Sequence, residues 1–182
     1  MSDNNDKELL RLFRSSENRN YAFNMIVRKY QERLYWHIRK MVLDHDDAND
    51  LLQNTFIKAW KGLDNFREDA ELFTWLYRIA TNETLTFLKQ KRNKFLLPIV
   101  DVEKELEQNL ESDQYFDGNE LQKKVQKAIL TLPAKQRLIF NMKYFDDMKY
   151  EEIAEVLGTS VGALKASFHL ATKKIQKYIE NN

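Results

Sequence analysis

Apolar residues recur every three or four positions along most of this chain, which is the period of a helix buried on one side. The pattern predicts a short helix around residues 9–13 and longer ones over 21–43, 47–61, 72–93, 121–131 and 133–144. The chain has four glycines and two prolines, and it carries no sustained alternation of β-branched residues. We therefore expect an all-α protein.

Residues 150–177 predict two further helices joined by a tight turn. Gly158 offers the left-handed backbone with which many helices end, and Thr159 or Ser160 can cap the helix that follows. The inner side of that second helix carries Val161, Leu164, Phe168, Ala171 and Ile175. Two helices with so short a connection form a helix-turn-helix, in which the second helix enters the major groove of DNA.

The composition of the 182-residue chain excludes several classes of site. Without cysteine it can form no disulfide, thiolate nucleophile or cysteine-ligated zinc site. No apolar run approaches the roughly 18 residues of a membrane-spanning helix. The first six residues are polar and acidic and do not resemble a secretory signal. We expect a cytoplasmic protein with no membrane insertion.

The net charge of +1 results from a cancellation between segments. Residues 94–120 hold eight acidic residues and two lysines, a net charge of −6, whereas the rest of the chain holds 27 basic and 20 acidic residues, a net charge of +7. A weakly patterned acidic stretch between two basic parts is typical of a linker. We predict two small helical domains, at 1–93 and 119–182, joined by a flexible acidic linker over 94–118.

Aromatic and basic side chains are interleaved between residues 66 and 82. Single-stranded nucleic acid requires both, because its bases stack on aromatic faces and its phosphates bind cations. The same aromatics also fit an ordinary core stripe, and spacing alone favours core packing for any one ring. Lysines and an arginine near residues 89–94 fit the negative end of a helix dipole as well as a phosphate. Both interpretations stay open.

A third stretch, residues 47–60, is a helix with a polar side opposite its apolar stripe. Asp47, Asp50 and Asn54 lie on that polar side. Taken alone it is a solvated helix face, and a face that docks a protein partner is the alternative.

These stretches occur in the order found in the extracytoplasmic-function (ECF) group of the sigma-70 family of RNA polymerase sigma factors. Residues 47–56, Asp-Ala-Asn-Asp-Leu-Leu-Gln-Asn-Thr-Phe, resemble the family's Asp-Ala-Glu-Asp-Leu-Val-Gln-Glu-Thr-Phe. Residues 73–82, Phe-Thr-Trp-Leu-Tyr-Arg-Ile-Ala-Thr-Asn, resemble its Phe-x-x-Trp-Leu-Tyr-Arg-Ile-Ala-x-Asn, with one residue fewer between Phe and Trp. Leu132-Pro133, the pair Tyr144-Phe145 and residues 150–158 are similar to its second domain. The resemblance covers nearly the whole chain.

The resemblance implies a sigma factor, which is not an enzyme in its own right, needs no cofactor, binds core RNA polymerase and directs promoter-specific initiation. Docking on the clamp helices of the β′ subunit would involve Asp47, Asp50, Leu51, Gln53, Asn54, Phe56 and Trp60. Recognition and melting of the −10 element would involve Phe66, Arg67, Phe73, Trp75, Arg78, Asn82, Thr86, Lys89, Gln90 and Arg92. The −35 element would bind Ser160, Gly162, Ala163, Lys165, Ala166, Ser167, His169 and Lys173. The β flap, promoter DNA and an anti-sigma factor are the other implied partners.

The second helix of the helix-turn-helix departs from the family pattern. Where the family commonly has Val-Lys-Ser-Arg-Leu-His-Arg-Ala-Arg, residues 164–172 are Leu-Lys-Ala-Ser-Phe-His-Leu-Ala-Thr. Ser167, Leu170 and Thr172 thus replace three arginines, and arginine is the commonest side chain that reads guanine. We expect this helix to depend more on phosphate contacts and groove shape.

Two other functions compete with this interpretation. A stand-alone two-domain helix-turn-helix transcription regulator would bind duplex DNA without polymerase, but the first domain shows no signature of a ligand pocket or phospho-acceptor. A helical-bundle metalloenzyme would use His37, His45, Asp46 and Asp47, but the inward Glu-x-x-His pairs of di-iron proteins are absent. Neither a nucleophile elbow nor a phosphate-binding loop occurs, so no catalytic residue, metal or cofactor is predicted.

Overall fold

The computed structural model describes residues 3–15, 17–94, 108 and 120–181. Its helices are α1 (Asp3–Phe13), α2 (Arg19–Val42), α3 (His45–Gly62), the 3₁₀ turn η1 (Leu63–Asn65), α4 (Leu72–Lys94), α6 (Glu120–Leu130), α7 (Ala134–Tyr144), α8 (Tyr150–Leu157) and α9 (Val161–Asn181). No strand occurs in the described ranges, and the prediction of an all-α protein is confirmed. The linker predicted over 94–118 lies almost wholly outside the described residues.

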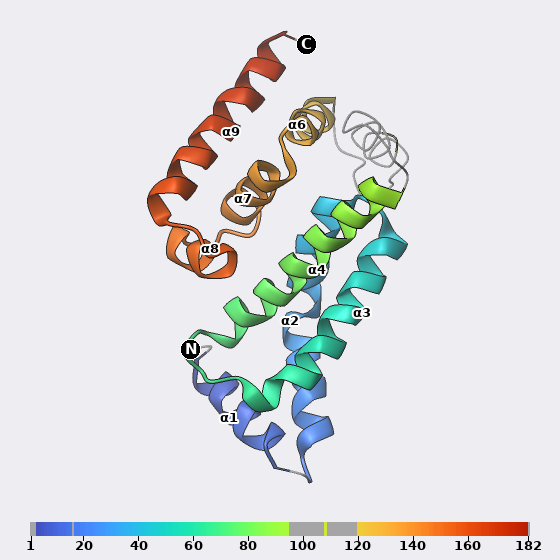
Figure 1. Cartoon of the computed structure of the whole chain (residues 1–182), viewed down its shortest axis with the longest axis vertical. Coiled ribbons are helices and arrows are strands. Elements are labelled where there is room, and N and C mark those ends of the chain that lie inside the picture. Colours follow the sequence, from blue (N-terminus) through green and yellow to red (C-terminus); the bar gives the residue numbers. More distant parts are fainter. Residues whose placement is uncertain (1–2, 16, 95–107, 109–119, 182) are drawn as a thin grey trace.

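Helices α1 to α4 form one bundle, in which α2 contacts each of the other three (Figure 1). Aromatic rings fill the core between α1, α2 and α3. The Trp60 ring centre lies 5.3 Å from that of Phe13 and 4.9 Å from that of Phe23, and both pairs meet edge to face. Aromatic pairs prefer this geometry because the positive edge of one ring meets the negative face of the other.

Local signals fix where the helices of this bundle begin and how closely they pack. The Asp44 carboxylate accepts a hydrogen bond from the backbone N–H of Asp47 at 2.8 Å and so caps the start of α3. Near the end of α3, a Cβ on Gly62 would lie only 3.1 Å from Cζ2 of Trp75. Gly62 therefore allows α3 to approach the first turns of α4.

Helices α6 to α9 form the second group, in which α9 contacts the other three. Their small core contains Ala128, Ile129, Leu132, Phe140, Ala171 and Ile175. The Phe140 and Phe168 rings stack with their centres 5.5 Å apart, which joins α7 to α9. Gly158 has a φ of 61°, so it ends α8 in the left-handed conformation predicted from the sequence.

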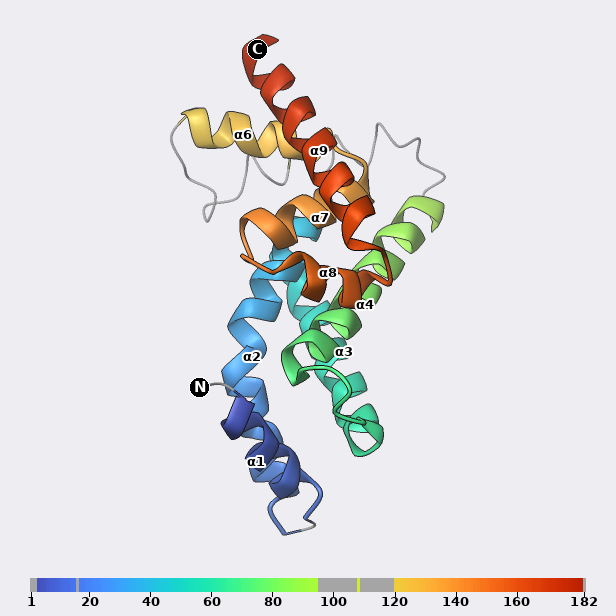
Figure 2. The same cartoon turned by 90° about the vertical axis from the view of Figure 1, so that its left-hand side faces the viewer.

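The two groups of helices pack against each other, with α8 against α4 and α7 against α2 (Figures 1 and 2). Leu138, Met142 and Ile153 of the second group belong to the same hydrophobic core as the residues of α2 and α4. Arg78 of α4 donates a hydrogen bond from Nη2 to the backbone oxygen of Glu155 in α8 at 2.6 Å. The sequence predicts the two groups of helices but gave no indication of this contact between them.

Candidate polymerase and nucleic-acid interfaces

The polar side predicted for α3 is exposed along the helix. Asp50, Gln53 and Asn54 are exposed on it, and Asp47 is partly exposed, with Oδ2 3.2 Å from Nζ of Lys91. Ile57 lies one turn beyond Gln53 and Asn54 and is 47% exposed. Ile57 is thus a large apolar side chain exposed within an otherwise polar surface.

Three residues predicted to dock the polymerase instead face the interior. Leu51 is 5% exposed and Phe56 is 8% exposed, and Trp60 is partly buried between Phe13 and Phe23. Leu51 and Phe56 lie on the inner stripe of α3 because of their spacing, and their part in polymerase binding stays a prediction. Their packing fixes which side of α3 is exposed.

The outer side of α4 carries the polar residues predicted for the −10 element. Arg78, Asn82, Thr86, Lys89 and Gln90 are all exposed there, and their spacing of three to four residues places them in one row. Arg92 belongs to the last turns of the same helix, and Arg67 is exposed in the loop before it. The row is uncharged or basic throughout, as a surface for nucleic acid requires.

The aromatics predicted to stack on bases lie mostly in the core. Phe66 is 7% exposed, with its ring 5.1 Å from that of Trp75, and Phe73 is 9% exposed, with its ring 4.4 Å from that of Tyr77. The guanidinium of Arg33 lies over the Phe73 ring, 4.2 Å from its centre. Phe66 and Phe73 thus pack in the core, as the core alternative predicts, and their stacking on bases stays a prediction. Trp75 is partly buried.

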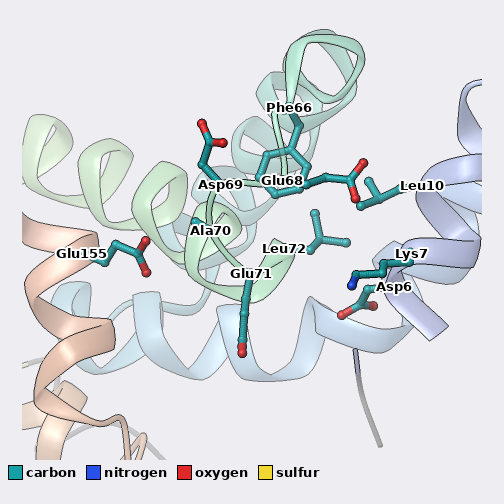
Figure 3. A pocket seen from close by; sticks show the side chains of 10 residues that line it. All are labelled: Asp6, Lys7, Leu10, Phe66, Glu68, Asp69, Ala70, Glu71, Leu72 and Glu155. Atoms are coloured by element: carbon teal, nitrogen blue, oxygen red, sulfur yellow. The ribbon is translucent and has the colours of Figure 1, made fainter. Parts of the chain in front are cut away.

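A cavity of about 350 Å³ lies beside the loop that precedes α4 (Figure 3). Its lining comes from α1, this loop, the start of α4 and α8, and consists of Asp6, Lys7, Leu10, Phe66, Glu68, Asp69, Ala70, Glu71, Leu72 and Glu155. Five of these side chains are carboxylates and one is a lysine, so the cavity disfavours phosphate. Glu155 belongs to the second group of helices, so the cavity in this form depends on the contact between the groups.

The helix-turn-helix has the predicted geometry. Ser160 is the residue that caps α9, because its hydroxyl accepts a hydrogen bond from the backbone N–H of Ala163 at 3.3 Å. The buried side of α9 holds Leu164, Ala171 and Ile175. Seven of the residues predicted for the −35 element are exposed on the opposite side: Ser160, Gly162, Ala163, Lys165, Ala166, His169 and Lys173. Ser167 is only partly exposed.

His37 and His45 each contact side chains within the structure and form no shared metal site. His37 contacts Asp146 and Thr81, while His45 contacts the hydroxyl of Tyr35. Among the described residues, no group of three potential ligands could hold a metal ion. In the same ranges, no helix combines the length and the apolar character needed to cross a membrane.

Comparison with known families matches both groups of helices. Residues 26–94 match the family model described as Sigma-70 region 2. Residues 122–175 match the model described as Sigma-70, region 4. The two models cover most of α2, all of α3 and α4, and most of α6 to α9, and these helices carry the three exposed surfaces described above.

Relatives match over most of the chain. The RNA polymerase sigma-H factor of Pseudomonas aeruginosa is 30% identical over 190 residues, covering 99% of this chain and 96% of that protein. The ECF RNA polymerase sigma factor SigW of Bacillus subtilis is 31% identical over 169 residues, covering 88% and 90%.

Two solved structures have a similar fold at 22% sequence identity. One is CnrH in complex with the cytosolic domain of CnrY, with a TM-score of 0.71 and coverage of 98% of this chain and 99% of CnrH. The other is the sigma factor RpoE of Bartonella quintana in complex with the anti-sigma factor NepR, with a TM-score of 0.67 and coverage of 87% and 96%.

Proposed function

The chain belongs to the extracytoplasmic-function group of the sigma-70 family of RNA polymerase sigma factors, and we propose that its three exposed surfaces divide promoter-specific initiation among them. A sigma factor binds core RNA polymerase and recognises the promoter, while the catalysis belongs to the polymerase. The ordered match to region 2 and region 4 carries this conclusion. A stand-alone regulator, the alternative function, is not favoured.

The outer side of α3 is proposed to dock on the clamp helices of the β′ subunit. Asp50, Gln53 and Asn54 supply polar contacts, and Ile57 supplies an apolar contact one turn beyond Gln53 and Asn54. The burial of Leu51 and Phe56 supports this assignment, because their packing fixes the rotation of α3 and thereby which side it presents. The polymerase is the enzyme in this complex, and the chain is proposed to act with it in the cytoplasm.

The outer row of α4 is proposed to bind the −10 element as it melts. Lys89 and Arg78 can contact phosphates, and Asn82, Thr86 and Gln90 can contact bases or sugars. Phe66 and Phe73 are proposed to act from the core, where they hold the loop and the first turns of α4 in position. Opening the duplex costs a few kcal/mol, which contacts to the separated bases can offset.

The outer side of α9 is proposed to bind the −35 element as duplex DNA. Promoter elements roughly 25 base pairs apart are separated by about 85 Å at ~3.4 Å per base pair. In the structure the two groups of helices pack against each other, an arrangement called closed from here on. In this closed arrangement, Arg78 on the proposed −10 surface is hydrogen-bonded to the backbone of α8. We therefore propose that α6–α9 separate from α1–α4 when the chain binds polymerase and promoter. The β flap and an anti-sigma factor are proposed as further partners.

Run-off transcription with purified core enzyme tests the proposed function. Holoenzyme formed with this chain should give a product from templates that carry its promoter, and core enzyme alone should give none. Binding of fluorescently labelled chain to core enzyme should be measured in parallel. A chain that binds duplex DNA without core enzyme and gives no promoter-dependent product would contradict the proposal in favour of the stand-alone regulator.

A further inference from the structure

The second group of helices has no arginine on its surface with which to read guanine. From residue 120 onward the sequence contains a single arginine, Arg137. Arg137 lies in α7 and is 4% exposed, so its side chain is buried. Paired hydrogen bonds from arginine to guanine are the commonest specific contact in the major groove. The specificity of α9 must therefore come from other side chains.

The exposed side of α9 presents small and apolar side chains where a major groove would lie. Leu170 is 51% exposed, and Gly162, Ala163 and Ala166 are exposed with it. Residues 162, 166 and 170 are four apart, so they form one ridge along the helix. A glycine and an alanine before Leu170 leave the helix axis free to approach the base edges closely.

Leu170 is the one replaced arginine position that reaches this ridge. Ser167 and Thr172 are only partly exposed, and the Thr172 hydroxyl donates a hydrogen bond to the backbone oxygen of Phe168 at 2.9 Å. A single exposed leucine on a protein surface is common and means little by itself. Leu170 differs because it lies on the recognition side of a helix-turn-helix and between basic side chains.

The charge of α9 suits a DNA partner along its whole length. Lys165, Lys173, Lys174 and Lys177 are exposed, and the helix has no acidic residue before Glu180. Lysine binds phosphate as a point charge, which attracts any DNA sequence to a similar extent. These lysines can thus supply attraction that does not depend on the DNA sequence.

We propose that α9 recognises thymine through its 5-methyl group, with Leu170 and Ala166 forming the apolar surface that the methyl contacts. The thymine methyl is the apolar group that the major groove displays, and apolar side chains are its usual partners. This inference rests on the proposed function, because it names the chemistry that the −35 surface recognises. It predicts an upstream element with thymine at the base pair that Leu170 contacts. Relatives with arginine in place of Leu170 should favour another base there.

Replacing thymine by uracil tests the inference, since uracil lacks only the methyl group. The probe is a pool of duplex DNA that carries a working −10 element and a randomised upstream element, bound by holoenzyme and sequenced after selection. Thymines in the selected duplex are then replaced one at a time by uracil. At one or two positions, binding should fall about threefold to fivefold, the effect of one methyl group removed from an apolar contact.

Variants assign that methyl contact to a side chain. Leu170→Ala should bind the thymine duplex as weakly as the uracil duplex, and Leu170→Arg should shift the selected base at that position toward guanine. Leu170 is exposed, so neither change disturbs the core. Lys173→Ala is the matched control: it should weaken both duplexes by the same factor and leave the thymine-to-uracil ratio unchanged.

Three results would overturn the inference: a selected upstream element without thymine, equal binding of all uracil duplexes, or a thymine preference that persists in Leu170→Ala. Each of these leaves the proposed function intact, provided that run-off transcription still depends on the promoter. Loss of all promoter-dependent product with native chain would instead count against the proposed function.

Discussion

The Asp146 carboxylate, in the turn after α7, lies 3.0 Å from Nδ1 of His37 in α2. Its other oxygen is 2.6 Å from Nζ of Lys40. The Asp146 side chain is 4% exposed and the His37 side chain is fully buried. Nε2 of His37 is in turn 2.9 Å from the Thr81 hydroxyl of α4. One buried carboxylate therefore ties the second group of helices to two helices of the first.

Replacing Asp146 should open the closed arrangement. Asp146→Asn keeps the shape of the side chain but removes the charge that faces Lys40 and His37. A hydrogen bond to a charged group contributes on the order of 2 kcal/mol, so the population of open molecules should rise. Small-angle X-ray scattering of the isolated chain should show a larger radius of gyration.

The neighbouring residue offers a matched control for this change. Asp147 is exposed and has a φ of 51°, a conformation in which asparagine is as well tolerated as aspartate. Asp147→Asn should therefore leave the radius of gyration unchanged. If Asp146→Asn were as compact as the native chain, the apolar contacts alone would hold the two groups together.

Acid should open the closed arrangement through the same carboxylate. Burial acts to raise the pKa of Asp146, but the hydrogen bond and charge of His37 and the charge of Lys40 outweigh it, so this pKa lies below its ordinary value. The ionised carboxylate thus favours the closed form above the ordinary pKa of about 3.9. That contribution is lost as the pH falls through the lowered pKa.

Scattering measured between pH 7 and pH 3 checks this dependence. Asp146 should cause no change between pH 7 and pH 5, and the native chain should expand at lower pH. The charged and titratable groups around Asp146 are His37, Lys40 and Arg33 of α2 and Tyr77 of α4. Asp146→Asn should lack the acid-dependent step. A step of equal size in this variant would assign the expansion to another group.

The sequence predicted the helices well, because their end signals are local. Asp44 and Gly158 act within one turn of their own positions. It did not predict which side chains of a matching motif are buried, because a motif does not distinguish a residue that meets a ligand from one that supports the helix; Phe56 and Phe73 are both buried. The pairing of His37 with Asp146 could not be predicted at all, because the two are distant in the chain and no local pattern relates them.

Ile57 should be the apolar anchor of polymerase binding. Ile57→Ser removes an exposed apolar side chain, so core binding should weaken by about tenfold, within the range of interface anchors, while the melting temperature stays the same. Leu51→Ala should instead lower the free energy of unfolding by about 2–5 kcal/mol, because it leaves a cavity in the core. Titration of core enzyme with labelled chain and thermal unfolding separate the two effects.

An exposed aromatic on another helix is the control for Ile57→Ser. Tyr21 of α2 is 60% exposed, so Tyr21→Ser removes a comparable apolar surface elsewhere on the same group of helices. This variant should bind core enzyme like the native chain. Equal weakening by both changes would show that binding responds to general surface polarity and not to the proposed side of α3.

Lys89 and Asn82 of α4 should differ in how they contribute to the −10 contact. Lys89→Ala removes one phosphate contact, so holoenzyme should bind all promoters more weakly and the slope of log K against log salt should become shallower by about 1. Asn82→Ala removes a side chain able to contact a base, so it should alter discrimination between −10 variants and leave that slope unchanged. Core binding should survive both changes, because α3 is untouched.

Promoter binding by holoenzyme across a salt series, with a base-substituted −10 element as the comparison, measures both quantities. An unchanged slope in Lys89→Ala would place this lysine outside the DNA contact and move the basic end of α4 to a structural role.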